Sequence, residues 1–175
     1  MVQTQTIPHT SASMLRLGLP IAAAWFLIDQ VSKWWIINSV MQPPRVIPVT
    51  EFFNLVLWHN TGVSFGLFGD TSPWMLMIFT LAMVIGLIVW LMRAANRLTA
   101  IALGLIIGGA LANILDRLRH GAVTDFLDFY VAAYHWPAFN LADVGIVSGV
   151  SLLLLESVWP RGEGRVRKAD PNSIR

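Results

Sequence analysis

The sequence alternates long apolar stretches with short polar segments. Four stretches, approximately residues 17–38, 71–92, 98–115 and 139–159, contain almost only apolar side chains. A bilayer core of about 30 Å requires about 20 such residues in a helix, because hydrocarbon offers no partner for unpaired backbone groups. The pattern therefore predicts an all-α membrane protein with four transmembrane helices.

The polar interval after the first span has a pattern of its own. Residues 52–58 are rich in β-formers, Asn60-Thr61-Gly62 is a turn signal, and another apolar run follows at 63–68. This predicts a small β-cradle over about residues 45–70 that rests on the membrane. Its apolar content suits contact with lipid or with an extended peptide. A plain structural cover for the helix ends is the alternative.

The composition agrees with a membrane protein. The chain of 175 residues is 55% apolar and only 13% charged, with a mean hydropathy of +0.62. A soluble domain is about 25% charged, and a disordered chain combines low hydrophobicity with high net charge. The sequence contains no cysteine, which excludes disulfides and thiol chemistry. Its basic residues form no stripe interleaved with aromatic ones, so we expect no nucleic-acid partner.

The distribution of basic residues predicts the orientation. With four spans, both termini lie on one side, and that side holds eight of the twelve Lys and Arg residues. The positive-inside rule places it in the cytoplasm, so that the β-cradle faces outward, into the periplasm if the protein comes from a Gram-negative bacterium. We expect a cytoplasmic tail at residues 1–16, a membrane domain at 17–160 and a second cytoplasmic tail at 161–175.

Ionisable residues inside the predicted spans are the first candidates for function, because they are costly in hydrocarbon. Asp29 and Lys33 are four residues apart on one helix face, and we interpret them as a structural ion pair. Asn113 and Arg117 also share a face. Arg117 is either an anchor at the membrane surface or a group that binds a carboxylate or lipid headgroup.

Asp143 opens the fourth span, about one turn inside the membrane, where the helix dipole favours its anion. Asn140, three residues earlier, is a candidate N-cap, so that the two residues also resemble a capping box. Asp125 and Asp128 lie among aromatic residues in the second outward segment. From the pattern alone, Asp143 is either a capping residue or a reactive one.

Two carboxylates that share a proton can hydrolyse an amide. If Asp125 approached Asp143, like-charge repulsion and burial would raise one pKa and leave one base and one acid. The base would activate a water, and the acid would protonate the leaving nitrogen. The sequence shows no motif for zinc, for a serine nucleophile or for phosphate, so we expect no metal and no cofactor.

Two other classes of function remain open. A proton-coupled transporter would use Asp29, Asp143 or Glu156, but such a protein is expected to carry its key acid near the midplane of the bilayer. Asp29 and Asp143 both fall near the outer face. In a non-catalytic scaffold, the aspartates would only cap helices and pair with Arg117 or Arg119. A scaffold would tolerate asparagine at Asp125 and Asp143.

The chain resembles the lipoprotein signal peptidases (signal peptidase II), which are four-span aspartyl proteases of the bacterial inner membrane. The resemblance covers roughly residues 17–160 and depends on five ordered motifs. These are Asp29-Gln30-Val31-Ser32-Lys33, Asn60-Thr61-Gly62-Val63-Ser64-Phe65, Gly108-Gly109-Ala110-Leu111-Ala112-Asn113 with Asp116-Arg117, Val123-Thr124-Asp125-Phe126, and Phe139-Asn140-Leu141-Ala142-Asp143.

The resemblance implies that Asp125 and Asp143 are the catalytic pair and that Asp128 is a bystander. It implies that five further residues line or brace the site, with Asp29 and Lys33 supporting the first helix. The five are Asn60, Gly62, Asn113, Arg117 and Asn140.

The resemblance also implies the substrate, a prolipoprotein signal peptide that ends before a cysteine carrying diacylglyceryl. Membrane lipids and the cyclic peptide globomycin are implied as further partners, and a monomer is the default oligomeric state. Thr124 is the one departure from the family pattern, which usually has an apolar residue before the aspartate.

Overall fold

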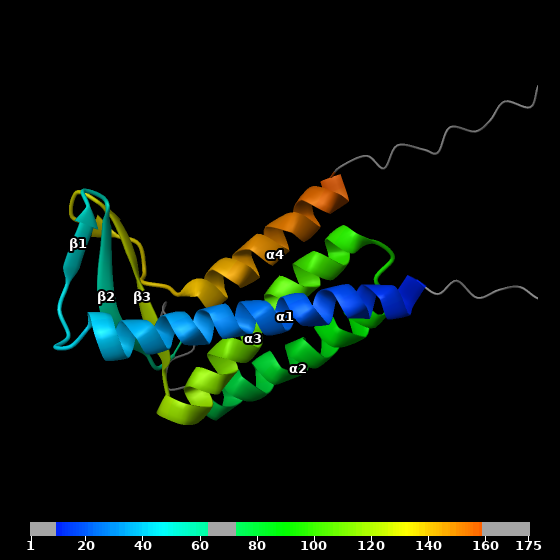
Figure 1. The fold of residues 1–175 in the computed structure, drawn as a ribbon, viewed down its shortest axis with the longest axis horizontal. Helices are drawn as coiled ribbons and strands as arrows, with labels where there is room; N and C mark the ends of the chain where they lie inside the picture. Colours follow the sequence, from blue (N-terminus) through cyan, green and yellow to red (C-terminus); the bar gives the residue numbers. More distant parts are fainter. Residues whose placement is uncertain (1–9, 63–72, 159–175) are drawn as a thin grey trace, which may run out of the picture.

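The computed structural model describes residues 10–62 and 73–158. Within them, four helices are long and apolar enough to cross a membrane (Figure 1). They are α1 (Thr10–Trp35), α2 (Pro73–Met92), α3 (Arg97–His120) and α4 (Leu141–Val158). A π-helical turn, η1 (Ile36–Val40), continues α1 without a break. The predicted four-helix membrane fold is confirmed.

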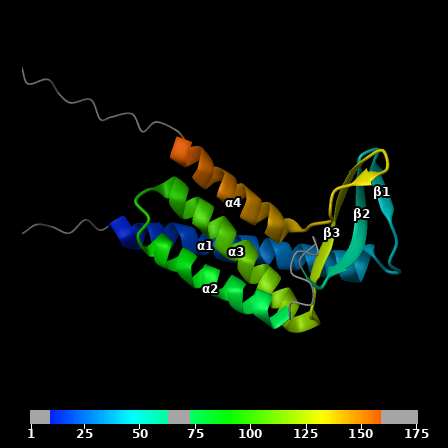
Figure 2. The same ribbon diagram turned by 180° about the vertical axis from the view of Figure 1, so that it is seen from behind.

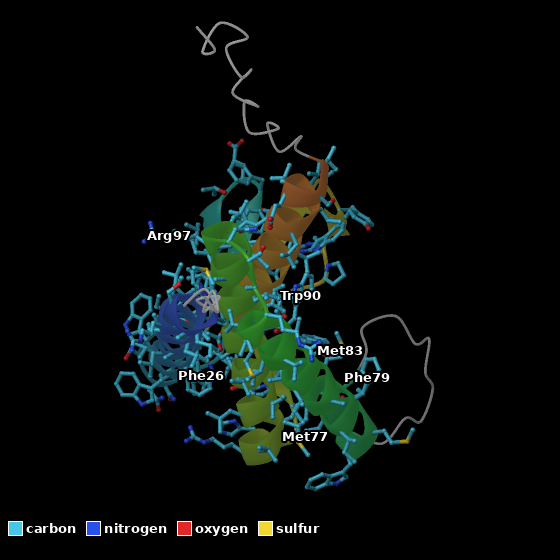
Figure 3. The ribbon with its side chains drawn as sticks, turned by 90° about the vertical axis from the view of Figure 1, so that its right-hand side faces the viewer. Phe26, Met77, Phe79, Met83, Trp90 and Arg97 are labelled. Atoms are coloured by element: carbon cyan, nitrogen blue, oxygen red, sulfur yellow. The ribbon has the colours of Figure 1, made fainter. Side chains whose placement is uncertain are left out.

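The helix α3 occupies the centre of the bundle. In α3, 72% of the most apolar 18-residue stretch is buried inside the protein. The corresponding share is 11–17% in the other three helices, whose apolar surfaces are left for lipid. Phe79 and Met83 lie on the side of α2 that faces away from α1 (Figure 3). Gly104 and Gly108 let α3 approach α1, because a Cβ there would meet the carbonyl oxygens of Gly18 and Ala22 at 2.6 and 2.4 Å.

A small antiparallel sheet lies at one end of the bundle, beside the end of α1 and the start of α4 (Figures 1 and 2). Its strands are β1 (Ile47–Thr50), β2 (Phe53–Asn60), β3 (Val123–Val131) and β4 (Tyr134–His135), in that spatial order. The predicted cradle is confirmed, but the sheet takes β3 and β4 from the second outward segment. The predicted apolar run at 63–68 lies outside the described residues.

Two helices differ in length from their predicted spans. α1 begins at Thr10 rather than near residue 17, and α3 continues past residue 115 to His120. Gly121 then ends α3 in the left-handed conformation, with φ of 71°, and its N–H donates to the carbonyl of Arg117. Hydropathy detects only the apolar part of each helix, whereas polar turns extend both helices beyond it. β3 starts two residues after this cap.

Candidate active site

Asn140 contacts both of the candidate catalytic aspartates. Its side-chain Nδ2 donates to Asp125 Oδ1 at 2.6 Å, and its backbone N–H donates to Asp143 Oδ2 at 3.2 Å. In return, the backbone N–H of Asp143 donates to Asn140 Oδ1 at 3.0 Å. This reciprocal pair is the capping box of α4 that the sequence predicts. The structure therefore brings the two aspartates to one residue.

Strand pairing explains how Asp125 reaches the start of α4. Phe139 bonds with β3 through its backbone: its carbonyl accepts from the N–H groups of Phe126 and Leu127 at 3.0 and 2.9 Å, and its N–H donates to the carbonyl of Leu127 at 3.0 Å. The next residue, Asn140, is consequently held beside Asp125. Trp25 fixes the same segment from α1, since its Nε1 donates to the carbonyl of Leu141 at 2.9 Å.

Asp125 is almost fully enclosed, with 2% of its surface exposed. Asn60 Nδ2 donates to Asp125 Oδ2 at 3.1 Å, and the N–H of Gly62 donates to Asn60 Oδ1 at 3.2 Å, which fixes the orientation of that amide. Burial raises the pKa of Asp125 from 3.8 to about 6, and the charge of Asp143 adds to this, against the lowering effect of the bonds from Asn60 and Asn140. Asp125 can therefore hold or release a proton near neutral pH.

Asp143 is held by α3 as well as by its own helix. Asn113 Nδ2 donates to Asp143 Oδ1 at 2.9 Å. The other end of the same amide, Asn113 Oδ1, accepts from Lys33 Nζ at 3.2 Å and from Asn140 Nδ2 at 3.4 Å. Because Lys33 has only donors, it fixes which end of the Asn113 amide faces Asp143.

Asp29 and Lys33 form the predicted ion pair, with Nζ and Oδ2 2.7 Å apart. Lys33 also reaches Asp116 Oδ2 at 2.7 Å, and Gln30 Nε2 donates to Asp116 Oδ1 at 2.8 Å. Asp29 Oδ1 accepts the N–H of Ala142 at 2.7 Å, in the first turn of α4. Gln30 and Asp116 belong to this group as well, which the sequence alone did not predict, although Asp116 shares a helix face with Asn113.

Arg117 is half-buried and its guanidinium faces the site. Nη1 donates to the carbonyl of Asn113 at 3.3 Å, while Nε is buried and has no hydrogen-bond partner among the described residues. The charges of Asp143 and Asp125 both act on this guanidinium. This position favours the interpretation that Arg117 binds a group in the site over that of a simple anchor.

A cavity of about 870 Å³ opens beside Asp125. Its lining comes from residues 44–46, 56–62 and 135–138 together with Asp125 and Asp128, and includes Asn60 and Gly62. No residue of α1, α2, α3 or α4 contributes to it, so this cavity lies outside the membrane-spanning part of the chain. The small exposed part of Asp125 thus belongs to the wall of a cavity on the side on which the sheet lies.

Other candidate residues lie apart from the aspartate pair. Asp128 accepts a bond from Asn54 Nδ2 at 3.0 Å, and His135 Nδ1 is 2.9 Å from both of its carboxylate oxygens. Glu156 lies near the other end of the bundle, where Asn96 and Thr99 donate to it. Among residues 10–62 and 73–158, no group of three or more His, Cys, Asp or Glu side chains is placed to hold a metal.

Comparison with known proteins gives a consistent result. The family model for signal peptidase (SPase) II matches residues 21–159. A lipoprotein signal peptidase of Methylorubrum extorquens is 47% identical over 152 residues, covering 83% of this chain and 87% of the relative. A lipoprotein signal peptidase of Ralstonia nicotianae is 42% identical over 144 residues, covering 80% and 83%.

The fold is shared with a solved structure. A bacterial membrane enzyme whose structure was determined by the in meso method at 2.3 Å resolution is 27% identical, with a TM-score of 0.73. The match covers 87% of this chain and 94% of that one. The chain is therefore a multi-pass membrane protein of the signal peptidase II family, the proteases that remove signal peptides from prolipoproteins.

Proposed function

We propose that the protein is an aspartyl endopeptidase that cleaves diacylglyceryl-modified prolipoproteins before the lipidated cysteine, with Asp125 and Asp143 as the catalytic pair. The observation that carries the proposal is the double contact of Asn140, which donates to one oxygen of each carboxylate. Two acids that are eighteen positions apart in the sequence (125 to 143) are thus hydrogen-bonded to the same residue. No metal or cofactor takes part.

The surroundings of the two aspartates suggest different roles. Asp143 accepts hydrogen bonds from Asn113 Nδ2 and from the backbone N–H of Asn140, the residue before α4. These donors stabilise a carboxylate, so Asp143 acts as the base that deprotonates water. Asp125, whose pKa is raised to about 6 by burial, acts as the acid. It assists the scissile carbonyl oxygen and then gives its proton to the leaving nitrogen.

The supporting residues act through these two. Asn60, oriented by Gly62, holds Asp125, and Asn113, oriented by Lys33, holds Asp143. Arg117 Nε, which has no hydrogen-bond partner within residues 10–62 and 73–158, is a donor for the oxyanion that forms during attack on the carbonyl. Asp29 and Lys33 brace the start of α4.

The position of the site accounts for the substrate class. The lipid and the apolar signal helix remain in the bilayer, which brings the scissile bond to the membrane surface at Asp143. The proposed setting is the bacterial inner membrane, with both termini in the cytoplasm and the sheet in the periplasm. Globomycin is expected to bind between the aspartates, and the protein is expected to act as a monomer.

Substitution of each aspartate tests the catalytic pair. Purified Asp125→Asn and Asp143→Asn are expected to cleave a lipidated prolipoprotein at least 10³-fold more slowly than wild type in a gel-shift assay, because each removes a group that moves a proton. Asp128→Asn, on the same strand, is the matched control and is expected to retain activity of the wild-type order. Near-normal turnover by either of the first two variants would contradict the pair.

A second assay tests the lipid requirement. The unlipidated precursor is expected to be cleaved much more slowly than the lipidated one, because it lacks the anchor that holds the scissile bond at the depth of Asp143. Equal rates for the two precursors would contradict a lipid-dependent peptidase and leave a general membrane protease.

A further inference from the structure

The cavity beside Asp125 has a cationic group that the proposed reaction does not use. Arg45 lines it, is exposed, and makes no ion pair within the described parts of the chain. It lies in the segment that precedes β1, which is at the opposite edge of the sheet from β4. An arginine with a free guanidinium at a cavity wall is a binding group for an anion.

The other charges at the cavity leave this role to Arg45. Asp128 accepts a hydrogen bond from Asn54 Nδ2 and lies 2.9 Å from His135 Nδ1, so its carboxylate oxygens already have partners within the sheet. Asp125 belongs to the catalytic pair and would repel an anion placed directly against it. His59 also lines the cavity. An anionic group is therefore expected near Arg45 and away from Asp125.

The position of the cavity identifies the part of the substrate that enters it. All of its lining residues lie outside the four transmembrane helices. If the signal helix and the lipid remain in the bilayer, only the chain that follows the cysteine can extend over the sheet. A cavity of about 870 Å³ has room for several residues of an extended peptide.

We propose that this cavity is a subsite for the first residues of the mature lipoprotein, and that Arg45 gives it a preference for an acidic side chain a short distance after the cysteine. The inference rests on the proposed function, because it requires a substrate cleaved at the aspartate pair. It assigns to Arg45 a role in substrate choice.

The test compares three lipidated precursors that carry Asp, Asn or Lys at the second to fourth positions after the cysteine. Wild type is expected to show the highest kcat/KM for the Asp precursor and the lowest for the Lys precursor. This difference is expected to come from KM. In Arg45→Gln, the ratio of kcat/KM between the Asp and Asn precursors is expected to fall about two- to fivefold, the usual range for an exposed ion pair. Arg45→Glu is expected to reverse the order.

Arg119→Gln is the matched control, since Arg119 is an exposed arginine at the end of α3 that does not line the cavity. Arg119→Gln is expected to leave the ratio unchanged. An equal effect there would reduce the result to general electrostatic attraction and overturn the subsite.

A uniform loss for all three precursors in Arg45→Gln would indicate that Arg45 binds a lipid headgroup instead, and would also overturn the subsite. Equal cleavage of all three by wild type contradicts only the subsite, whereas no cleavage of any precursor contradicts the proposed function and the subsite with it.

Discussion

Asn140 combines two tasks in one amide. Its Oδ1 caps α4 by accepting the N–H of Asp143, and its Nδ2 donates to Asp125. A shorter capping residue could perform the first task but would not reach Asp125. The stability of the helix and the geometry of the pair can therefore be separated by substitution.

We expect Asn140→Ala to lose both tasks, with a loss of about 0.5–2 kcal/mol in the free energy of unfolding from the missing cap. Asn140→Ser is expected to recover most of that stability, because serine caps helices well, but not the lost kcat. Thermal unfolding in detergent and cleavage kinetics measure the two effects. If serine restored kcat along with stability, the contact with Asp125 would be irrelevant to catalysis.

The raised pKa of Asp125 predicts the direction of the pH dependence. If Asp125 is the acid, the protonated form is active, and kcat/KM is expected to fall as pH rises through about 6. The free energy of unfolding is expected to change in the same direction. Between pH 3.8 and about 6, the Asp125 carboxyl group keeps its proton in the folded state but has lost it in the unfolded state, so the protein becomes less stable as pH rises. A kcat/KM that rises through pH 6 would make Asp125 the base and reverse the proposed roles.

At the scale of the elements, α3 packs closely against the first turn of α4. A Cβ at Gly109 of α3 would lie 2.3 Å from the carbonyl oxygen of Ala142, next to Asp143. A Cβ at Gly86 of α2 would meet nothing within 4 Å. An alanine is thus expected to clash at Gly109 in α3 and to fit without a clash at Gly86 in α2.

Gly109→Ala is expected to destabilise the protein by about 1–3 kcal/mol and to lower kcat, because α4 must move away from α3. Gly86→Ala is expected to be neutral or to stabilise by up to about 1 kcal/mol, since alanine favours the helix. Thermal unfolding and cleavage rates of both variants check this. A Gly109→Ala protein with unchanged stability and rate would show that the first turn of α4 has room to shift.

At the scale of the whole molecule, the orientation can be tested directly, because the chain has no cysteine of its own. Val49 in β1 and Ala95 in the turn between α2 and α3 are both exposed. The strand β1 and this turn lie towards opposite ends of the molecule (Figure 1). In intact cells with a permeabilised outer membrane, an impermeant maleimide is expected to label Val49→Cys and not Ala95→Cys. The reverse pattern would invert the proposed topology.

The sequence predicted those features that depend on neighbouring residues. The four spans follow from local hydropathy, the pair of Asp29 and Lys33 from spacing along one helix, and the cap at Asn140 from three consecutive positions. The second half of the sheet was missed, because the pairing of β2 with β3 joins segments about seventy residues apart in a register that no local pattern specifies.

The same limit applies to the site. The contact of Lys33 with Asp116 and the link from Asn113 to Asp143 depend on how α1, α3 and α4 pack, which spacing within one helix does not reveal. The family motifs imply which residues form the site, but not how these residues contact one another. The orientation of the Asn113 amide by Lys33 is a property of the packed bundle alone.

The two aspartates belong to different parts of the molecule, Asp125 to the sheet and Asp143 to a helix of the bundle. A substitution elsewhere that tilted the sheet by a few degrees would therefore change the distance between the two carboxylates, although both aspartates would still be present. A compound that binds against β2 or β3 and displaces the sheet is therefore expected to lower the cleavage rate without touching either carboxylate.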